Sequence, residues 1–154
     1  MKIKIGFFSF TCCGGCILEF IELLNKKFFD YKEKIDISYF NALKSAHIQK
    51  LHIAFIEGAI STKEELERLK KIRKNSSVVV AIGSGAINGW PSNLRNSLPN
   101  SVLDKKKISR QLPKILPASK VINIDEQIPG CPIQRKELET KLSILIRNAQ
   151  QHLN

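Results

Sequence analysis

The sequence has no long apolar run and few aromatic residues. No stretch approaches the ~18 consecutive apolar residues of a membrane-spanning helix, and Phe, Tyr and Trp make up only 7% of the 154 residues. Proteins that read nucleic-acid sequence commonly present aromatic side chains or a recognisable motif, and the chain contains no such motif. The composition therefore argues against a spanning segment and against specific nucleic-acid binding.

Acidic residues are also scarce. The chain has 14 Asp and Glu against 25 Lys and Arg, which gives a net charge of +11 and an isoelectric point near 9.7. This balance fits an anionic partner such as an acidic protein surface, but a plain solvated surface is the favoured interpretation. The basic residues are dispersed, apart from two clusters at 70–74 and 105–107. The apolar fraction of 43% is ordinary for a globular domain.

The N-terminal stretch, MKIKIGFFSFTCCGGC, is basic and then apolar, as the start of a signal peptide would be. Its apolar part is short and strand-like, however, and no clean small-residue cleavage site follows it. We therefore interpret this stretch as the first core strand of a cytoplasmic protein.

Short apolar runs alternate with segments of helical periodicity along the chain. The runs predict strands, and apolar residues repeating every three or four positions predict helices. Thr62 is followed three residues later by Glu65, the capping-box pattern of a helix start. The segment Asn88–Pro117, rich in Asn, Pro, Ser and Lys, is predicted to loop over the surface. Strands are expected at Lys2–Phe10, Ile35–Phe40, Leu51–Ile56, Ser77–Ile82 and Val121–Ile124, and helices at Ile17–Phe29, Thr62–Arg73 and Ile133–Gln150.

Apolar strands without clean alternation, separated by helices, predict a parallel sheet covered on both faces. We therefore expect an α/β fold, a flavodoxin-like doubly wound parallel sheet, formed as a single domain by residues 1–154. Ligands of such sheets bind at the carboxyl ends of the strands. Two of the loops at those ends hold all four cysteines; the loops are Thr11–Cys16, Glu57–Ser61, Gly83–Gly89 and Gln127–Ile133.

The four cysteines are clustered. Cys12, Cys13 and Cys16 lie within five residues, and Cys131 follows 115 residues after Cys16. In a reducing compartment this pattern indicates metal or redox chemistry more than structural disulfides. Burial as simple core residues is common for isolated cysteines, but it suits three thiols in one glycine-containing loop poorly.

Several kinds of chemistry remain open at this point. Four thiolates could bind a cubane iron–sulfur cluster or a zinc ion, although zinc sites usually draw on two CxxC knuckles and only one is present. A dithiol oxidoreductase would use Cys13 and Cys16, with the start of the following helix lowering the pKa of the first thiol. That interpretation leaves Cys12 and Cys131 without a role. The loop at Gly83–Gly85 could alternatively bind a phosphate.

Four segments together resemble the small subunit of [NiFe] hydrogenases and the related 20 kDa subunit of respiratory complex I. Residues 13–19, CGGCILE, are similar to the CxxCxxE signature of the hydrogenase subunits, and the tandem Cys12-Cys13 is similar to the complex I arrangement. These segments occur in family order and cover nearly the whole chain. The other three are Ile56–Thr62, Ala81–Ala86 with Gly89–Pro91, and Pro129–Pro132.

The resemblance implies a non-catalytic electron-transfer subunit of an oxidoreductase. Such a subunit would hold one [4Fe–4S] cluster beside a [NiFe] hydrogenase-type large subunit. It would relay electrons between the nickel–iron centre of that subunit and further iron–sulfur or flavin subunits. Hydrogen chemistry would belong to the large subunit, and any membrane attachment would go through partners.

One position departs from the family pattern. The family has Gly-x-Cys-Ala after the fourth strand where this chain has Gly-Ser-Gly-Ala, so Gly85 replaces the third cluster cysteine. Cys12 could take over as the fourth ligand; Ser84, water or a partner residue could complete the cluster; or a cluster-less subunit could retain only a structural role. We favour the first outcome, with the ligands Cys12, Cys13, Cys16 and Cys131.

Other residues of the matched segments are candidates for supporting roles. Glu19 could face a subunit boundary or simply be an exposed helix residue, and Trp90 could anchor an interface. Glu57 could be a proton-relay or interface carboxylate, or it could serve as a helix cap or ion-pair partner. Four glycines could let the backbone approach the cluster, or merely form tight turns: Gly14, Gly15, Gly83 and Gly85. Three histidines match no ligand pattern: His47, His52 and His152.

Overall fold

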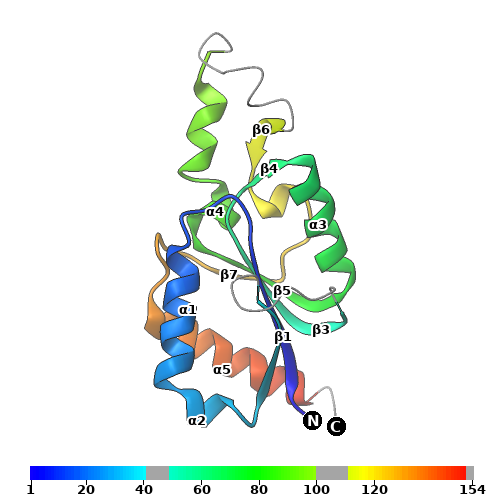
Figure 1. The fold of residues 1–154 in the computed structure, drawn as a ribbon, viewed down its shortest axis with the longest axis vertical. Coiled ribbons are helices and arrows are strands. Elements are labelled where there is room, and N and C mark those ends of the chain that lie inside the picture. Colours follow the sequence, from blue (N-terminus) through cyan, green and yellow to red (C-terminus); the bar gives the residue numbers. More distant parts are fainter. Residues whose placement is uncertain (41–48, 100–110, 152–154) are drawn as a thin grey trace.

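The computed structural model describes residues 1–40, 49–99 and 111–151 (Figure 1). Five strands form one parallel sheet in the order β2-β1-β3-β5-β7. Within this sheet the chain winds outward from β1 and β3 in both directions, which is the flavodoxin-type order. The strands are β1 (Ile3–Ser9), β2 (Ile35–Phe40), β3 (Leu51–Glu57), β5 (Ser76–Ile82) and β7 (Glu126–Ile128).

Helices cover both faces of this sheet. One apolar core joins the sheet to α1 and α5, and a second core on the other face joins it to α3 and α4 (Figure 1). The central strands are apolar along most of their length because both of their faces are buried. The predicted doubly wound α/β fold is thereby confirmed. The helices are α1 (Gly15–Lys26), α2 (Phe28–Tyr31), α3 (Lys63–Lys74), α4 (Gly83–Asn88) and α5 (Arg135–Gln151), with 3-10 turns η1 (Ser92–Ser97) and η2 (Ala118–Lys120).

A cluster of phenylalanines fixes α1 against the sheet. The ring of Phe20 lies 4.8 Å from that of Phe7 on β1 and 5.5 Å from that of Phe55 on β3, measured between ring centroids. All three side chains are fully buried, and burial of each contributes about 1.5–3 kcal/mol. Because Phe20 lies about one turn into α1, this packing sets the start of the helix at the carboxyl end of β1.

The predicted capping box of α3 is present. The Glu65 amide donates to the Thr62 hydroxyl at 3.1 Å, and the Thr62 amide donates to the Glu65 carboxylate at 3.2 Å. Acidic residues occupy the first turn of α3 and basic residues its last turn, as the helix dipole favours. The cluster of basic residues at 70–74 therefore lies in this helix.

Three predictions for the C-terminal half are wrong. The segment Gly83–Gly89 is not a loop, because most of it forms the helix α4. Val121–Ile124 is not a strand; its apolar side chains pack against the α3-side core, and the fifth strand of the sheet is β7. The segment Asn88–Pro117 is not all loop, because it contains η1 and the strand β6 (Gln111–Leu116). β6 pairs antiparallel with β4 (Ile60–Thr62) in a separate two-stranded sheet. Residues 100–110, which include the cluster of basic residues at 105–107, lie outside the described residues.

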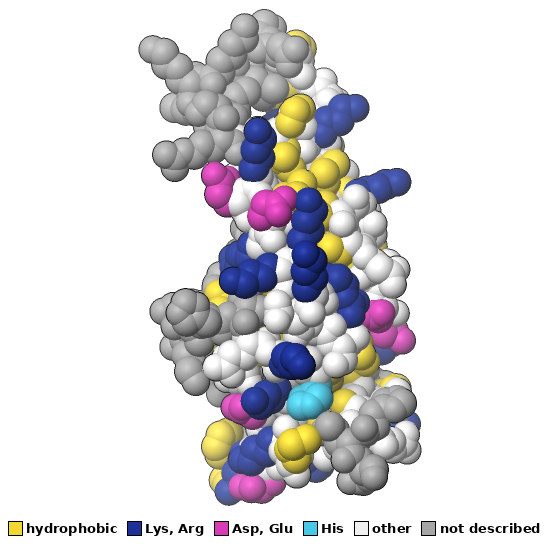
Figure 2. Space-filling model, turned by 90° about the vertical axis from the view of Figure 1, so that its right-hand side faces the viewer, with side chains coloured by type: hydrophobic (Ala, Val, Ile, Leu, Met, Phe, Trp, Pro, Cys, Tyr) yellow, Lys and Arg dark blue, Asp and Glu magenta, His cyan; other side chains and the backbone are white. Residues whose placement is uncertain are grey.

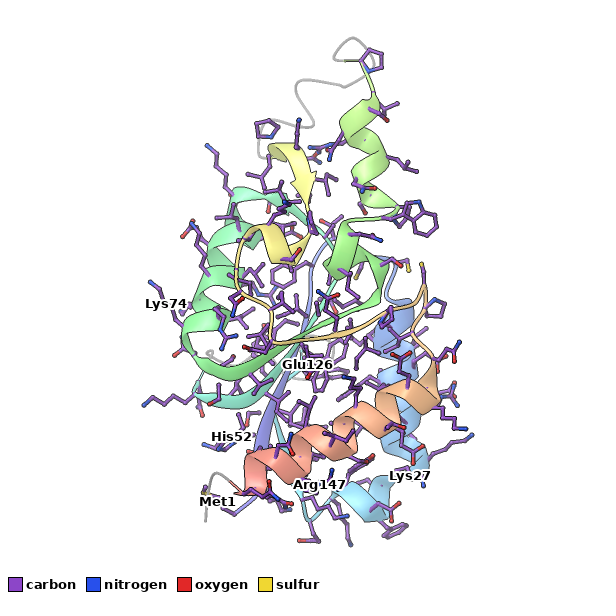
Figure 3. All side chains as sticks on the ribbon, turned by 180° about the vertical axis from the view of Figure 1, so that it is seen from behind. Met1, Lys27, His52, Lys74, Glu126 and Arg147 are labelled. Carbon is purple, nitrogen blue, oxygen red and sulfur yellow. The ribbon has the colours of Figure 1, made fainter. Side chains whose placement is uncertain are left out.

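The outer surface is rich in cations. Figure 2 shows Lys and Arg side chains spread along the face on the side of α3, with fewer acidic side chains between them. On the opposite side of the sheet, α5 lies beside α1 (Figure 3), and Lys27 pairs with Glu139 of α5 at 3.1 Å. No helix within the described ranges is long and apolar enough to cross a membrane.

Candidate iron–sulfur site

Backbone hydrogen bonds hold the loops together at the carboxyl edge of the sheet. The Thr11 amide donates to the Ala59 carbonyl at 3.0 Å, and the Ala59 amide donates back at 2.9 Å. The Ser84 amide donates to the Gly130 carbonyl at 2.9 Å, which ties the start of α4 to the loop after β7. The loops after β1, β3, β5 and β7 are therefore joined in two pairs.

These loops surround a cavity of about 230 Å³, which we call the cysteine cavity. All four cysteines line it, as do most of the other residues predicted for the site. Cys16 is buried in the first turn of α1, whereas Cys12, Cys13 and Cys131 are exposed as whole residues, although part of each can still face the cavity wall. The lining residues are Thr11, Cys12, Cys13, Gly15, Cys16, Glu57, Ile82, Gly83, Ser84, Gly85, Trp90, Pro91, Ser92, Gly130, Cys131 and Pro132.

Glycine at position 83 makes room for the Cys16 thiol. Its φ of +74° is a left-handed conformation that side chains disfavour, and a Cβ there would lie only 2.6 Å from the Cys16 sulfur. Gly83 is therefore required by both the backbone and the thiol that packs on it. This gives the residue a role in shaping the cavity wall.

Gly85 and Cys12 both pack against Gly58, at the turn after β3. A Cβ on Gly85 would lie 3.0 Å from the Gly58 Cα, and a Cβ on Gly58 would lie 2.9 Å from the Cys12 Cβ. The position where the family has its third cysteine is thus close to the extra cysteine of this chain.

Glu57 is the buried carboxylate of the site, with 2% of its surface exposed. One carboxylate oxygen accepts the Cys16 amide proton at 3.0 Å, and the other accepts the Ser9 hydroxyl proton at 3.1 Å. No Lys, Arg or His of the described ranges forms an ion pair with it. Of the roles expected from the sequence, this geometry favours the helix cap.

Two of the thiols hold their protons strongly. Burial, and then the charge of Glu57, raise the pKa of the Cys12 thiol from 9.0 to about 12. Burial raises the pKa of the Cys16 thiol to about 11, although a hydrogen bond from the Ile133 backbone acts in the opposite direction. Both thiols must lose a proton before they can bind a metal.

Glu19 and Trp90 lie in different surroundings. Glu19 accepts a hydrogen bond from Arg135 of α5 at 2.9 Å, so it is neither free nor at the cavity. Trp90 lines the cavity and exposes 47% of its surface, directly after α4.

His52 accepts the Lys4 amide proton through Nδ1 at 2.8 Å, away from the cavity, whereas His47 and His152 lie outside the described residues.

The donor set of the cavity is one that an iron–sulfur cluster uses. Four thiols converge on it, and four cysteine thiolates are the usual ligands of cubane clusters. Within the described part of the chain, no group of three or more His, Cys, Asp or Glu is arranged as a metal site. The four thiols therefore match a cluster in their donor type and in the cavity that they share.

Sequence reasoning missed two residues of this arrangement. No sequence pattern marks Ser9, and none gives Gly58 a role of its own. Ser9 pairs with Glu57 in the parallel register of β1 and β3, and its position at the end of the first strand was the only available signal. The close packing of Gly58 on two other loops depends on tertiary structure, which no local pattern encodes.

The fold and the cavity define a flavodoxin-like protein with a four-cysteine site at the carboxyl edge of its sheet. Comparison with known proteins identifies its family: the family model for the NADH ubiquinone oxidoreductase 20 Kd subunit matches residues 13–144. The chain belongs to that family, which confirms the resemblance found in the sequence. The match begins at Cys13, so Cys12 lies outside it.

Two of the curated relatives that the chain matches are named as hydrogenase subunits. The chain is 30% identical over 141 residues to sulfhydrogenase 2 subunit delta of Pyrococcus furiosus, a match that covers 88% of this chain and 59% of the relative. It is 26% identical over 152 residues to the NAD-reducing hydrogenase HoxS subunit delta of Cupriavidus necator, covering 85% and 72%. The chain thus spans less than two thirds of the Pyrococcus relative.

Solved structures share the fold. A chain of an NAD+-reducing [NiFe]-hydrogenase in the H2-reduced state matches with a TM-score of 0.83, at 23% identity, over 96% of this chain and 93% of that one. A [NiFeSe] hydrogenase chain from Desulfovibrio vulgaris Hildenborough matches with a TM-score of 0.66 at 15% identity, over 93% and 59%.

Proposed function

We propose that this chain is an iron–sulfur electron-transfer subunit of a [NiFe] hydrogenase-type complex, with one [4Fe–4S] cluster in the cysteine cavity. The observation that carries this proposal is the convergence of all four cysteines on one cavity, in a chain whose relatives are hydrogenase subunits. A bound cluster of this kind supplies reversible one-electron transfer. The chain itself supplies thiolate ligands, a cavity wall that partly excludes water, and backbone amides that can donate hydrogen bonds.

Cys12 is proposed as the ligand that replaces the missing third cysteine. Its support is the shared contact with Gly58, which brings Cys12 and the empty side-chain position at Gly85 to the same part of the wall. With Cys13, Cys16 and Cys131, this completes four thiolates without a ligand from a partner.

Glycines at the cavity are proposed to hold the backbone close to the cluster. Gly14 is the N-cap of α1 in a left-handed conformation, and Gly15 is the first residue of the helix. The first amides of a helix have no partner within it and can donate to an acceptor in front of it. Such hydrogen bonds to cluster sulfur tune the redox potential.

The large subunit is proposed to dock over the mouth of the cavity. Trp90, Leu94 and Leu98 expose 47%, 59% and 48% of their surfaces on and around η1, and Trp90 also lines the cavity. Exposed apolar residues grouped in this way are typical of a protein interface. Docking here would bring the partner's metal centre close to the thiols, and any membrane attachment in a cytoplasmic complex would go through partners.

Two alternatives make different demands on the same thiols. A dithiol oxidoreductase would use the exposed Cys13 as the attacking thiol and the buried Cys16 as its partner, and it gives no role to Cys12 and Cys131, which line the same cavity. A cluster-less structural subunit would keep the fold and the apolar surface at η1 without using the thiols together.

The test is the iron and acid-labile sulfide content of the anaerobically purified complex, with EPR of the reduced state. We expect about four irons and about four sulfides per chain, and loss or conversion of the cluster in Cys12→Ser. Iron-free wild type under these conditions would contradict the electron-relay function. An unchanged cluster in Cys12→Ser would contradict the assignment of Cys12 alone.

A further inference from the structure

The helix that presents Cys16 to the cavity has no cap within its own sequence. Its N-cap residue is Gly14, which has no side chain to accept a hydrogen bond. The first amides of a helix lack partners inside it, and an uncapped start frays or requires an acceptor from elsewhere. For the Cys16 amide that acceptor is Glu57, 41 residues along the chain and on the neighbouring strand β3.

The carboxylate of Glu57 is itself fixed. Ser9 donates to its second oxygen at 3.1 Å, and the two residues are paired in the register of β1 and β3. The side chain is almost fully buried, and among the described residues it has no cationic partner. A buried carboxylate without a cation is costly. Two hydrogen bonds and the positive end of the α1 dipole offset that cost.

The same carboxylate lies close to Cys12. Cys12 packs against Gly58, the residue after Glu57, since a Cβ on Gly58 would lie 2.9 Å from the Cys12 Cβ. Glu57 thus accepts the amide proton of one cysteine and lines the cavity beside another. The Ser9–Glu57 pair is the only part of this arrangement that belongs to the rigid sheet.

We propose that Glu57 is the positioning residue of the cysteine cavity: anchored by Ser9, it holds the first turn of α1 so that Cys12 and Cys16 face the same space. The inference concerns this chain's own residues and deepens the proposed function. A purely packing role would be served better by an apolar or amide side chain, which would not carry the cost of a buried charge. The negative charge beside the thiols would also oppose addition of an electron to a bound cluster and lower its potential.

The first test uses the metal-free chain. We expect Glu57→Ala to increase hydrogen exchange at the Cys16 amide by about fivefold or more, as loss of a cap predicts, and to speed alkylation of Cys16 by iodoacetamide. Glu57→Gln retains an acceptor oxygen and should keep wild-type protection. Glu67→Gln removes the same charge from an exposed position on α3 and should change neither measurement.

The second test uses the iron-loaded complex and an EPR redox titration. Glu57→Gln should retain iron and shift the cluster midpoint to a more positive potential, whereas Glu67→Gln should leave it unchanged. Unaltered protection of the Cys16 amide in Glu57→Ala would overturn the proposal, as would equal loss in the Gln and Ala variants. If wild type held no iron, the proposed function would fail while the metal-free measurements would still decide the role of Glu57.

Discussion

Arg135 and Glu19 form an ion pair, at 2.9 Å, that joins the starts of two helices. Arg135 also contacts Glu22 at 2.7 Å, so one guanidinium spans two carboxylates of α1. Glu19 follows Cys16 by three residues, and Arg135 follows Cys131 by four. The pair therefore links the two segments of the chain that bring thiols to the cavity.

Loss of this ion pair should change the accessibility of the cavity thiols more than the stability of the fold. We expect Arg135→Ala to lower the thermal unfolding midpoint only slightly, because the pair is partly exposed and screened by salt. In the metal-free chain, alkylation of Cys131 relative to Cys13 should become faster. A double-mutant cycle with Glu19→Ala should show coupling; independent effects of the two substitutions would mean that the contact is incidental.

Gly83→Ala tests the packing of the cavity wall. The new methyl group would meet the Cys16 sulfur, and the positive φ would add strain, so we expect a loss of about 1–3 kcal/mol in the free energy of unfolding. Urea denaturation of the metal-free chain measures this. Gly85→Ala is the matched control, because Gly85 has no positive φ, and an equally large loss there would refute the special demand at position 83.

The proposed move of the fourth cluster ligand from position 85 to Cys12 can be tested by restoring a cysteine at position 85. If Cys12 replaces the family cysteine, Cys12→Ser should lose iron and Cys12→Ser with Gly85→Cys should regain it. The Cβ at position 85 requires a shift of a few tenths of an ångström against Gly58, so recovery is expected to be partial. Iron and sulfide analysis of the two variants, purified in parallel, gives the answer; no recovery at all would argue that position 85 no longer faces the site.

The raised thiol pKa values predict a loss of stability at alkaline pH. The pKa values of Cys12 and Cys16 in the folded chain, about 12 and about 11, exceed the ordinary value of 9.0, so the folded state binds protons more tightly than the unfolded state. Their contribution to stability is fully present below about pH 9 and declines as the pH rises toward those values.

Urea unfolding of the metal-free chain in reductant, from about pH 8 to about pH 11, measures this contribution. Wild type should lose more stability over the interval than the Cys12→Ser, Cys16→Ser double variant, in which the other alkaline groups still titrate. Parallel curves for the two proteins would show that these thiols do not contribute.

The apolar surface at η1 predicts a selective assembly defect. Trp90→Ala and Leu94→Ala should weaken co-purification with the large subunit, with little change in the unfolding midpoint of the isolated chain, since both side chains are largely exposed. Phe29→Ala removes a still more exposed aromatic from α2 and serves as the control. Equal effects of all three substitutions would contradict a localised interface.

The central sheet was predictable because its inner strands are apolar on both faces, and such runs stand out in a sequence. The edge strand β7 was not, since only Ile128 of its three residues is buried. The nearby apolar run Val121–Ile124 gave a stronger signal while packing as an irregular segment. β6 was hidden by Pro113, which a strand of a two-stranded sheet can accommodate at its free edge.

The candidate site was predictable to the level of its loops. Strand ends in a parallel sheet share one edge, which is sufficient to bring Cys131 toward the N-terminal cysteines. The partner of Glu57 was not predictable, because its amide contact crosses from β3 to α1 and depends on how Phe20 seats that helix. Glu19 was ambiguous for the same reason: its partner lies 116 residues away.

The separation of 115 residues between Cys16 and Cys131 has a consequence for the order of events during synthesis. Three thiols are synthesised well before the fourth, which follows directly after β7. β7 must pair with β5 before the cavity exists, and such long-range pairing is slow compared with local folding. A ligand that needs all four thiols can bind only after β7 has paired with β5 at the edge of the sheet. Occupancy of the cavity would then report that β7 has paired with β5.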